Sequence, residues 1–253
     1  MNNSYLVSII VPVYNAEKFI TETIASVQKQ TYQNWEHLIV IDNNSKDRTE
    51  SLVRAIEKQD SRVKCIRAAD AFGSAGNRNV GIREAKGELL AFLDADDLWA
   101  PEKLCKQIEF MQKHHSDFSV TAFQRVSEDG KSLGKILEVP GTFNKRDILF
   151  DNFIGCLTVL LRKKAFHDLK FVDLGWEDMS LWLECLSQIK EGHGLNEVLA
   201  YYRIVPGSRS HNKAFAAKLR WGTLRQAEKM SWPVAAYYFA CYGVTGVRKH
   251  FRF

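Results

Sequence analysis

The sequence lacks the features of a disulfide-stapled, zinc-binding or secreted protein. Its 253 residues include five cysteines, an odd number without a CxxC pair, which argues against a disulfide framework or a structural zinc site. Buried, reduced thiols in a cytosolic protein are the expectation. No basic segment followed by a long apolar run opens the chain, so no signal peptide is expected. The chain is nevertheless 45% hydrophobic, which excludes a disordered protein and suffices for one sizeable core.

The chain also has no proline- or serine-rich linker and no internal repeat, so we expect one domain over residues 1–212. The remaining tail, residues 213–253, holds eight basic residues and one acidic residue, a net charge of +7 that leaves −2 for the domain. Because the domain is not basic, a nucleic acid is not an expected partner. A basic tail instead suits an anionic surface such as a layer of lipid headgroups.

The tail contains an apolar segment, residues 233–247, that is rich in aromatic side chains and is followed by a basic cluster. This segment is shorter than the ~20 residues that a helix needs to cross a bilayer. We therefore expect a helix that makes a peripheral contact with the membrane surface. A helix docked on the domain and a contact within a homo-oligomer are the alternatives.

Strand-like and helix-like patterns alternate four times in the first half of the chain. Short apolar runs rich in β-branched residues predict strands at residues 7–13, 35–41, 63–67 and 89–93. Helical patterns follow them at residues 17–30, 45–58 and 73–85 and from Pro101 onward. This alternation predicts an α/β fold with a mostly parallel central sheet flanked by helices. The second half is less regular, with strands expected at 118–126, 136–139, 157–162 and 195–204 and a helix at 178–190.

Three carboxylates follow the fourth predicted strand: Asp94, Asp96 and Asp97. They repel one another unless a positive charge lies among them. A divalent cation meets that need, and Mg²⁺ or Mn²⁺ commonly shares its oxygen ligands with substrate phosphates. Ligands of open α/β sheets bind beyond the carboxyl ends of the strands, where Asp42 also lies. The alternative is a solvated acidic turn in which Asp97 caps the next helix.

Four motifs occur in order along the chain: Val7–Asn15, Val40–Ser45 with Asp47 and Thr49, Gly73–Gly81, and the acidic cluster. With them, residues 5–212 resemble the family 2 glycosyltransferases with the GT-A fold, most of all bacterial enzymes that build surface polysaccharides of the teichuronic acid, capsule or O-antigen type. The resemblance implies an inverting hexosyltransferase, dependent on Mn²⁺ or Mg²⁺, that moves a sugar from a nucleotide-sugar, a UDP-sugar, to a glycan or lipid-linked acceptor. It also implies a cytoplasmic protein, peripheral on the inner face of the cell membrane.

The resemblance assigns most of the donor site. Pro12, Tyr14 and Asn15 would line the nucleoside pocket, and Asp42 and Asn43 would face the base and the ribose. The family usually has aspartate where Asn43 stands, but an asparagine can still accept a hydrogen bond from the uracil N3–H and donate one to O4. A plain turn is the alternative for Asn43.

The remaining donor residues lie in the last two motifs. Gly73–Gly81 lacks the GxGxxG spacing of a dinucleotide-binding loop. The resemblance has Arg78 pointing toward Asp42 or the acidic cluster to hold the nucleotide, with a surface arginine as the alternative. Asp94 and Ala95 would contact the nucleotide-sugar, and Asp94 and Asp96 would hold the metal.

The segment Gly175-Trp-Glu-Asp178 resembles the acceptor-side motif of the family. The second acid of that motif, here Asp178, would be the base that removes the proton of the acceptor hydroxyl. Alternatively, Glu177 and Asp178 only favour the positive end of a helix. Further along, Arg203 and Arg209 would meet phosphate oxygens beside a lid that closes over the donor, and His211 would be an extra metal ligand.

Two other functions compete with sugar transfer. A nucleotidyltransferase shares a related fold and an acidic metal site, but no Gly/Lys-rich phosphate loop follows the first strand. A non-catalytic nucleotide-sugar-binding subunit would not need an acid in the position of Asp178.

Overall fold

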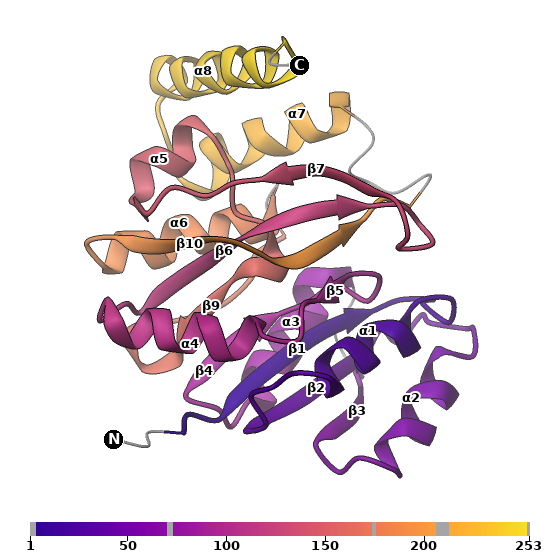
Figure 1. Cartoon of the computed structure of the whole chain (residues 1–253). Coiled ribbons are helices and arrows are strands. Elements are labelled where there is room, and N and C mark those ends of the chain that lie inside the picture. Colours follow the sequence, from indigo (N-terminus) through magenta and orange to yellow (C-terminus); the bar gives the residue numbers. More distant parts are fainter. Residues whose placement is uncertain (1–3, 70–72, 174–175, 206–212, 252–253) are drawn as a thin grey trace.

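The computed structural model describes residues 4–69, 73–173, 176–205 and 213–251 (Figure 1). Across these ranges, one mixed sheet has the strand order β3-β2-β1-β4-β9-β6-β10-β5, with β7 beside β6 and β8 beside β10. Its first half is parallel, as predicted, and consists of β1 (Val7–Val13), β2 (Trp35–Ile41), β3 (Val63–Arg67) and β4 (Leu89–Phe92). The helices that connect them are α1 (Ile20–Gln28), α2 (Thr49–Glu57) and α3 (Gly73–Glu84).

The second half of the sheet mixes directions. The strand β9 (Leu160–Arg162) runs antiparallel to both β4 and β6 (Phe118–Val126), and β10 (Gly192–Arg203) runs parallel to β6. The predicted strand at 157–162 is therefore shorter than expected, because Cys156–Thr158 (η1) forms a 3-10 turn. The other short elements are β5 (Leu98–Trp99), β7 (Leu133–Leu137), β8 (Thr142–Phe143) and the 3-10 turn Lys163–Ala165 (η2).

Helices cover both faces of the sheet because successive side chains of a strand point to opposite sides. Ile9 and Val11 of β1 pack with the cluster that includes α1, α2 and α4 (Lys103–Lys113). Ile10 packs with the cluster of α3, α5 (Lys145–Phe150) and α6 (Glu177–Gln188). Gly81 lets α3 approach the sheet closely, since a Cβ at this position would lie 2.4 Å from Cγ2 of Ile10. This three-layer arrangement confirms the predicted α/β fold.

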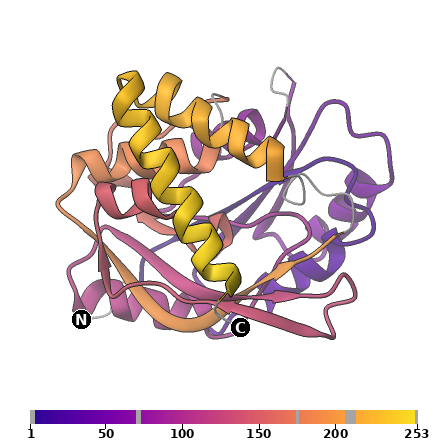
Figure 2. The ribbon, with the colours of Figure 1, turned by 90° about the horizontal axis from the view of Figure 1, so that it is seen from above.

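The tail forms α7 (Lys213–Gly222), a π-helical turn at Thr223–Ala227 (η4) and α8 (Trp232–Phe251). Figure 2 shows α8 lying across the helices on one side of the domain. Leu224 and Ala235 are fully buried, and the ring of Tyr238 lies 5.2 Å from that of Phe150 in α5. The described part of the tail is therefore docked on the domain, which was one of the alternatives.

Within the described ranges, no helix combines the length and the apolar character that crossing a bilayer requires.

Candidate active site

Asp42 ends β2 and organises the start of α3. Its Oδ2 accepts hydrogen bonds from the Gly73 backbone N–H at 2.8 Å and from Nδ2 of Asn77 at 3.0 Å. Its Oδ1 accepts one from the Asn44 N–H at 2.9 Å. Gly73 has a φ of +71°, a conformation that glycine adopts without strain. The glycine that opens this motif thus brings the start of α3 onto Asp42, and Asn77 is a polar contact that the sequence analysis missed.

The loop after β1 is tied to the loop after β2 by Asn15. Its Oδ1 accepts a hydrogen bond from the Lys46 N–H at 2.8 Å, and its own N–H donates to Oγ of Ser45 at 3.0 Å. Pro12 is buried and pairs in register with Val40. Tyr14, by contrast, is 60% exposed. Asn15 therefore shapes the predicted nucleoside pocket by fixing the loop after β1, and the Tyr14 side chain lies exposed on that loop.

Asn43 follows Asp42 on the same rim. Its side chain is exposed, and its backbone carbonyl accepts a hydrogen bond from Nη2 of Arg67 at 3.1 Å. The side-chain amide is thus placed in solvent rather than in the core. Its contact with a base stays a prediction.

Arg78 of α3 connects the two acidic parts of the site. Its Nη2 lies 2.6 Å from Oδ1 of Asp94, and its Nη1 lies 2.6 Å from Oε1 of Glu177. The arginine is only 5% exposed, and its guanidinium lies 5.2 Å from the centre of the Phe171 ring. Burial alone lowers the pKa of Arg78, but the neighbouring acidic groups outweigh burial and raise it. Arg78 therefore points to the acidic cluster and is not a surface arginine.

The three aspartates of the cluster have different surroundings. Asp97 is 1% exposed, and its Oδ1 accepts a hydrogen bond from the Arg203 N–H at 2.9 Å. It does not cap α4, whose N-cap is Glu102. Asp96, in contrast, accepts no side-chain hydrogen bond from another residue that the structure describes. Burial, together with the charge of Asp94, raises the pKa of Asp96 to about 6.

Arg203 braces the acidic turn from the inside. Its Nε donates to the backbone carbonyl of Asp96 at 2.7 Å, and its Nη2 pairs with Oε2 of Glu22 at 2.8 Å. Its Nη1 donates to the backbone carbonyl of Glu128. The guanidinium is thus engaged within the protein, and its contact with phosphate oxygens stays a prediction. Arg209 and His211 lie outside the described residues, as does the predicted lid.

The backbone of Ala95 is held from the opposite element, since its carbonyl oxygen accepts a hydrogen bond from Oγ1 of Thr23 in α1 at 2.8 Å. The turn that carries Asp94 and Asp96 is therefore fixed at Ala95, Asp96 and Asp97 by buried or half-buried partners. A turn held in this way keeps the carboxylates of Asp94 and Asp96 in place before any ligand arrives.

Asp178 occupies the first turn of α6, and its Oδ1 accepts a hydrogen bond from the Met179 N–H at 2.7 Å. Burial raises the pKa of Asp178 to about 6, against the opposing effect of Arg78. The neighbouring Glu177 is held by Arg78 and by the hydroxyl of Ser74. Of the acidic pair that opens α6, Asp178 therefore has the less engaged side chain.

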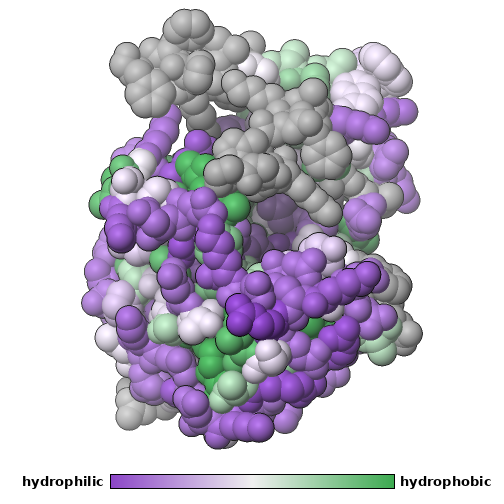
Figure 3. Space-filling model, turned by 90° about the vertical axis from the view of Figure 1, so that its right-hand side faces the viewer, coloured by the Kyte–Doolittle hydropathy of each residue, from purple (hydrophilic) through white to green (hydrophobic). Residues whose placement is uncertain are grey.

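Asp94, Arg78 and Asp178 line one pocket of about 600 Å³. The pocket lies beyond the carboxyl ends of the strands, where Asp94 follows β4, and Figure 3 shows a hollow in this face of the molecule. Several of its other lining residues were not predicted. They come from β6, the loop after α5, the residue before α6 and the tail: Arg125, Asn152, Trp176, Leu219 and Tyr242.

A family model, Glycosyl transferase family 2, matches residues 8–169. The chain belongs to glycosyltransferase family 2. It is 36% identical over 245 residues to the putative teichuronic acid biosynthesis glycosyltransferase TuaG of Bacillus subtilis, covering 96% of this chain and 97% of TuaG. It is also 36% identical over 250 residues to WfgD of Escherichia coli, a UDP-Glc:alpha-D-GlcNAc-diphosphoundecaprenol beta-1,3-glucosyltransferase, covering 98% and 96% of the two chains.

The fold of this family 2 glycosyltransferase is also that of a solved enzyme. The structure of Staphylococcus aureus TarS residues 1–349 in complex with UDP-GlcNAc superposes with a TM-score of 0.72 at 21% identity, covering 98% of this chain and 73% of TarS. This likeness confirms the GT-A fold.

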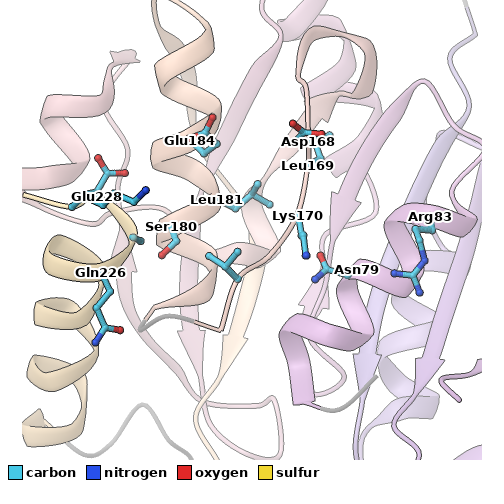
Figure 4. A pocket seen from close by; sticks show the side chains of 13 residues that line it. Asn79, Arg83, Asp168, Leu169, Lys170, Ser180, Leu181, Glu184, Gln226 and Glu228 are labelled. Carbon is cyan, nitrogen blue, oxygen red and sulfur yellow. The ribbon is translucent and has the colours of Figure 1, made fainter. Parts of the chain in front are cut away.

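A second cavity, of about 710 Å³, lies between α3, α6 and η4 (Figure 4). Arg83, Lys170 and Glu184 are among its lining residues, and none of the residues predicted for sugar transfer lines it. Asn79, the neighbour of Arg78 in the sequence, also lines it, and the side-chain amide of Asn79 exchanges two hydrogen bonds of 2.8 Å with the backbone of Phe171. The predicted residues Arg78, Asp94 and Asp178 therefore all belong to the other cavity.

The described residues contain no group of three or more His, Cys, Asp or Glu side chains arranged to hold a metal ion. The acidic turn offers two carboxylates instead, those of Asp94 and Asp96.

Proposed function

We propose that this family 2 enzyme inverts the anomeric centre as it transfers a hexose from a UDP-sugar to a lipid-linked glycan during the synthesis of a surface polysaccharide. The observation that carries the proposal is the single pocket in which Arg78 joins Asp94, on the donor side, to Glu177 beside Asp178. The names of TuaG and WfgD support the pathway and the acceptor class, and the UDP-GlcNAc bound to TarS supports the donor class. The pathway, the acceptor class and the donor class are those of TuaG, WfgD and TarS, and we propose them for this protein by similarity.

The proposed reaction forms one bond and breaks one bond at the anomeric carbon. The acceptor hydroxyl attacks this carbon opposite the departing UDP, and its proton passes to the carboxylate of Asp178. The bonding electrons of the sugar–phosphate bond leave with UDP. A base with a pKa of about 6 is deprotonated at neutral pH and still has useful proton affinity.

We assign Asp94 and Asp96 as the ligands of a divalent cation, Mn²⁺ or Mg²⁺. The half-buried Asp96 carboxylate forms no ion pair with the residues that the structure describes, and burial and the charge of Asp94 raise its pKa. Two carboxylates suit a cation that takes its remaining ligands from substrate phosphates and water. When bound, such a cation offsets the charge that develops on the departing diphosphate. Tyr14, Asp42 and Asn43 would then receive the nucleoside, and Arg209 and His211 stay candidates for the phosphates and the metal.

The metal assignment is tested by UDP binding rather than by turnover. Mn²⁺ is expected to tighten UDP binding to the wild type about tenfold or more, and Asp96→Ala is expected to abolish that gain. Isothermal titration calorimetry with UDP, with and without Mn²⁺, measures both effects. Asp129→Ala, at an exposed hairpin carboxylate, should keep the full gain. If UDP binds the wild type equally well without Mn²⁺, the metal assignment is wrong.

We further propose that the protein works at the cytoplasmic face of the membrane and touches it through α8. Trp232 is 66% exposed and Val234 is 44% exposed, although the opposite side of α8 is docked. The tail also has a net charge of +7, whereas the rest of the chain has a net charge of −2. Exposed aromatic residues beside basic ones are typical of an interfacial helix.

Removing α8 would uncover the apolar surface beneath it, including Phe150, on which Tyr238 packs, so point variants are the better test of the membrane contact. The double variant Trp232→Ser, Val234→Ser is expected to bind phosphatidylserine vesicles about tenfold more weakly in a co-sedimentation assay. Leu133→Ser, at an equally exposed apolar residue of β7, serves as the control and should bind like the wild type. Equal binding of the double variant and the wild type would rule out α8 as the contact.

A further inference from the structure

The tail closes one side of the catalytic pocket. Ala216 and Leu219 of α7 and Tyr242 of α8 line the same cavity as Asp178. The rings of Tyr242 and Trp176 have centroids 5.8 Å apart and planes at 81°. Trp176 immediately precedes the acidic pair at the start of α6. An aromatic corner, Trp176 and Tyr242, therefore stands next to the proposed base and is half supplied by the tail.

The aromatic corner is fixed by a buried cation from the tail. The guanidinium of the fully buried Arg220 lies 4.7 Å from the ring centre of Tyr242 and 5.9 Å from that of Trp176. It also donates hydrogen bonds to the backbone carbonyls of Ile148 and Leu149, at the end of α5. These contacts hold α7 and α8 against the domain. The docking of the tail thus determines the shape of the pocket. It also fixes the position of the exposed side of α8, which carries Trp232 and Val234.

Two side chains of the pocket, Arg125 of β6 and Asn152, have hydrogen-bond donors without a partner among the described residues. Arg125 lines the pocket and is exposed, and its guanidinium forms no hydrogen bond or ion pair with the residues that the structure describes. Asn152 lines the same pocket, and its Oδ1 accepts a hydrogen bond from the Ile154 N–H at 3.4 Å, which leaves its two amide N–H groups available. In contrast, both terminal nitrogens of Arg78 are already paired with carboxylates. Arg125 is thus the cation of this pocket that is ready for an anionic ligand.

We propose that this part of the pocket is the acceptor site and that it recognises a sugar diphosphate with an apolar chain. The sugar ring packs on Trp176 and Tyr242, and the diphosphate pairs with Arg125 and Asn152. The chain leaves past Ala216 and Leu219. The inference rests on the proposed function, and it adds the residues that select the acceptor. Aromatic faces suit the apolar faces of a pyranose, and an arginine fork matches phosphate oxygens in two parallel hydrogen bonds.

The charge of the pocket explains why these groups stand apart from the base. Asp94, Glu177 and Asp178 are acidic, and a diphosphate placed among them would be repelled. A sugar that lies between Asp178 and Arg125 separates the acceptor phosphates from these carboxylates. Its reacting hydroxyl then faces the base, while its anomeric phosphate faces Arg125.

The test compares two acceptors that differ only in the diphosphate: N-acetylglucosamine joined to an octyl chain directly, and the same sugar joined through a diphosphate. UDP-glucose is the donor, and the KM of each acceptor and the affinity for UDP are measured for every variant. Arg125→Gln is expected to raise the KM of the diphosphate acceptor about tenfold, with the KM of the other acceptor and the affinity for UDP unchanged. Tyr242→Ala is expected to raise the KM of both acceptors about tenfold, again without a change in UDP affinity.

Two control variants match the test variants. Lys131→Gln removes an exposed positive charge from the loop that follows β6, and Tyr237→Ala removes a tyrosine of α8 that is 55% exposed and lies outside the pocket. Neither control should change any of the three constants with these short-chain acceptors.

The outcomes separate the possible errors. If Arg125→Gln weakens UDP binding, or raises both KM values equally, Arg125 does not read the acceptor diphosphate and the inference is overturned. An unchanged KM for Tyr242→Ala removes the aromatic corner from the acceptor site. A wild type that binds UDP but transfers sugar to neither acceptor overturns the proposed acceptor class, and the inference with it. The result for Tyr242→Ala counts only if its melting temperature lies within a few degrees of that of Tyr237→Ala. If it does not, the test of the acceptor site rests on Arg125→Gln.

Discussion

Asp178→Asn is expected to lower kcat for sugar transfer roughly 10²–10⁴-fold, because the amide cannot take the proton of the acceptor hydroxyl. The substitution keeps the shape of the side chain, so the affinity for UDP should stay at the wild-type value. Initial rates at saturating donor and acceptor, together with calorimetric titration of UDP, separate these two effects. A non-catalytic nucleotide-sugar-binding subunit would show no transfer to lose.

Asp173→Asn is the matched control, since Asp173 is an exposed carboxylate that lines the same pocket. It should keep kcat to within a few-fold. A large loss for Asp173→Asn combined with full activity of Asp178→Asn would identify Asp173 as the base instead.

The same base predicts how the rate depends on pH. Burial raises the pKa of Asp178 to about 6, so at saturating Mn²⁺ the transfer rate should fall as the pH drops through about 6. Folding stability changes in the opposite direction. The folded state binds this proton more tightly than the unfolded chain does, so the contribution of Asp178 to stability declines as the pH rises from about 4 to above 6. Asp178→Asn should therefore be more stable than the wild type at pH 7.5, by at most about 3 kcal/mol, and should lose this advantage toward pH 4.

The parallel half of the sheet was predictable because its signals are local. Each of its strands is a short run of β-branched and apolar residues, and the carboxyl ends of parallel strands meet at one edge. That rule alone brings Asp42 and Asp94 to the same side of the molecule. The short helix α5 also carried a local signal that was overlooked, a capping box in which Asn144 and Asp147 bond to each other's backbone amides.

The partners of the charged side chains were not predictable, because they depend on contacts between distant segments. The phosphate contact of Arg203 stays a prediction, but its ion pair with Glu22, 181 positions earlier in the chain, could not be read from the sequence. The role of Asn15 in the nucleoside pocket also stays a prediction, and the hydrogen bond by which its side chain holds the loop at Lys46 had no signal in the sequence. Sequence patterns fix which groups reach the sheet edge, and only the packing decides which of them remain free for a ligand.

The tail shows the same limit. Its segment of aromatic and small residues fits a membrane surface and a docked helix equally well. The tail docks on the domain through Arg220, which is buried against Trp176 and Tyr242. These contacts join segments that are distant in the sequence, so the sequence alone could not predict them.

Arg78→Met is expected to destabilise the protein by about 3–5 kcal/mol, which corresponds to a loss of roughly 6–20 °C in melting temperature. The variant keeps much of the apolar contact with Phe171 but leaves Asp94 and Glu177 without their cation. A buried or half-buried carboxylate without a partner is costly, and this cost, rather than the value of the pair itself, dominates the loss. Differential scanning calorimetry at pH 7.5 measures it. Arg83→Met, five positions later on the same helix at an exposed arginine, should leave the melting temperature within a few degrees of the wild type.

Arg78→Lys distinguishes a bridge from a simple charge. A lysine carries one ammonium group and cannot present two parallel donors to Asp94 and Glu177, so this variant should recover part of the stability but not all of it. Because Arg78 holds down the pKa of Asp178, its loss should also move the acid limb of the pH–rate profile above 6. A Met variant that melts with the wild type and keeps its acid limb would show that Arg78 neither holds the two carboxylates nor tunes the base. If the acid limb of the pH–rate profile moves in Arg78→Met and returns to the wild-type position in Arg78→Lys, the positive charge of Arg78 tunes the base. The stability then depends on the two donor groups of its guanidinium.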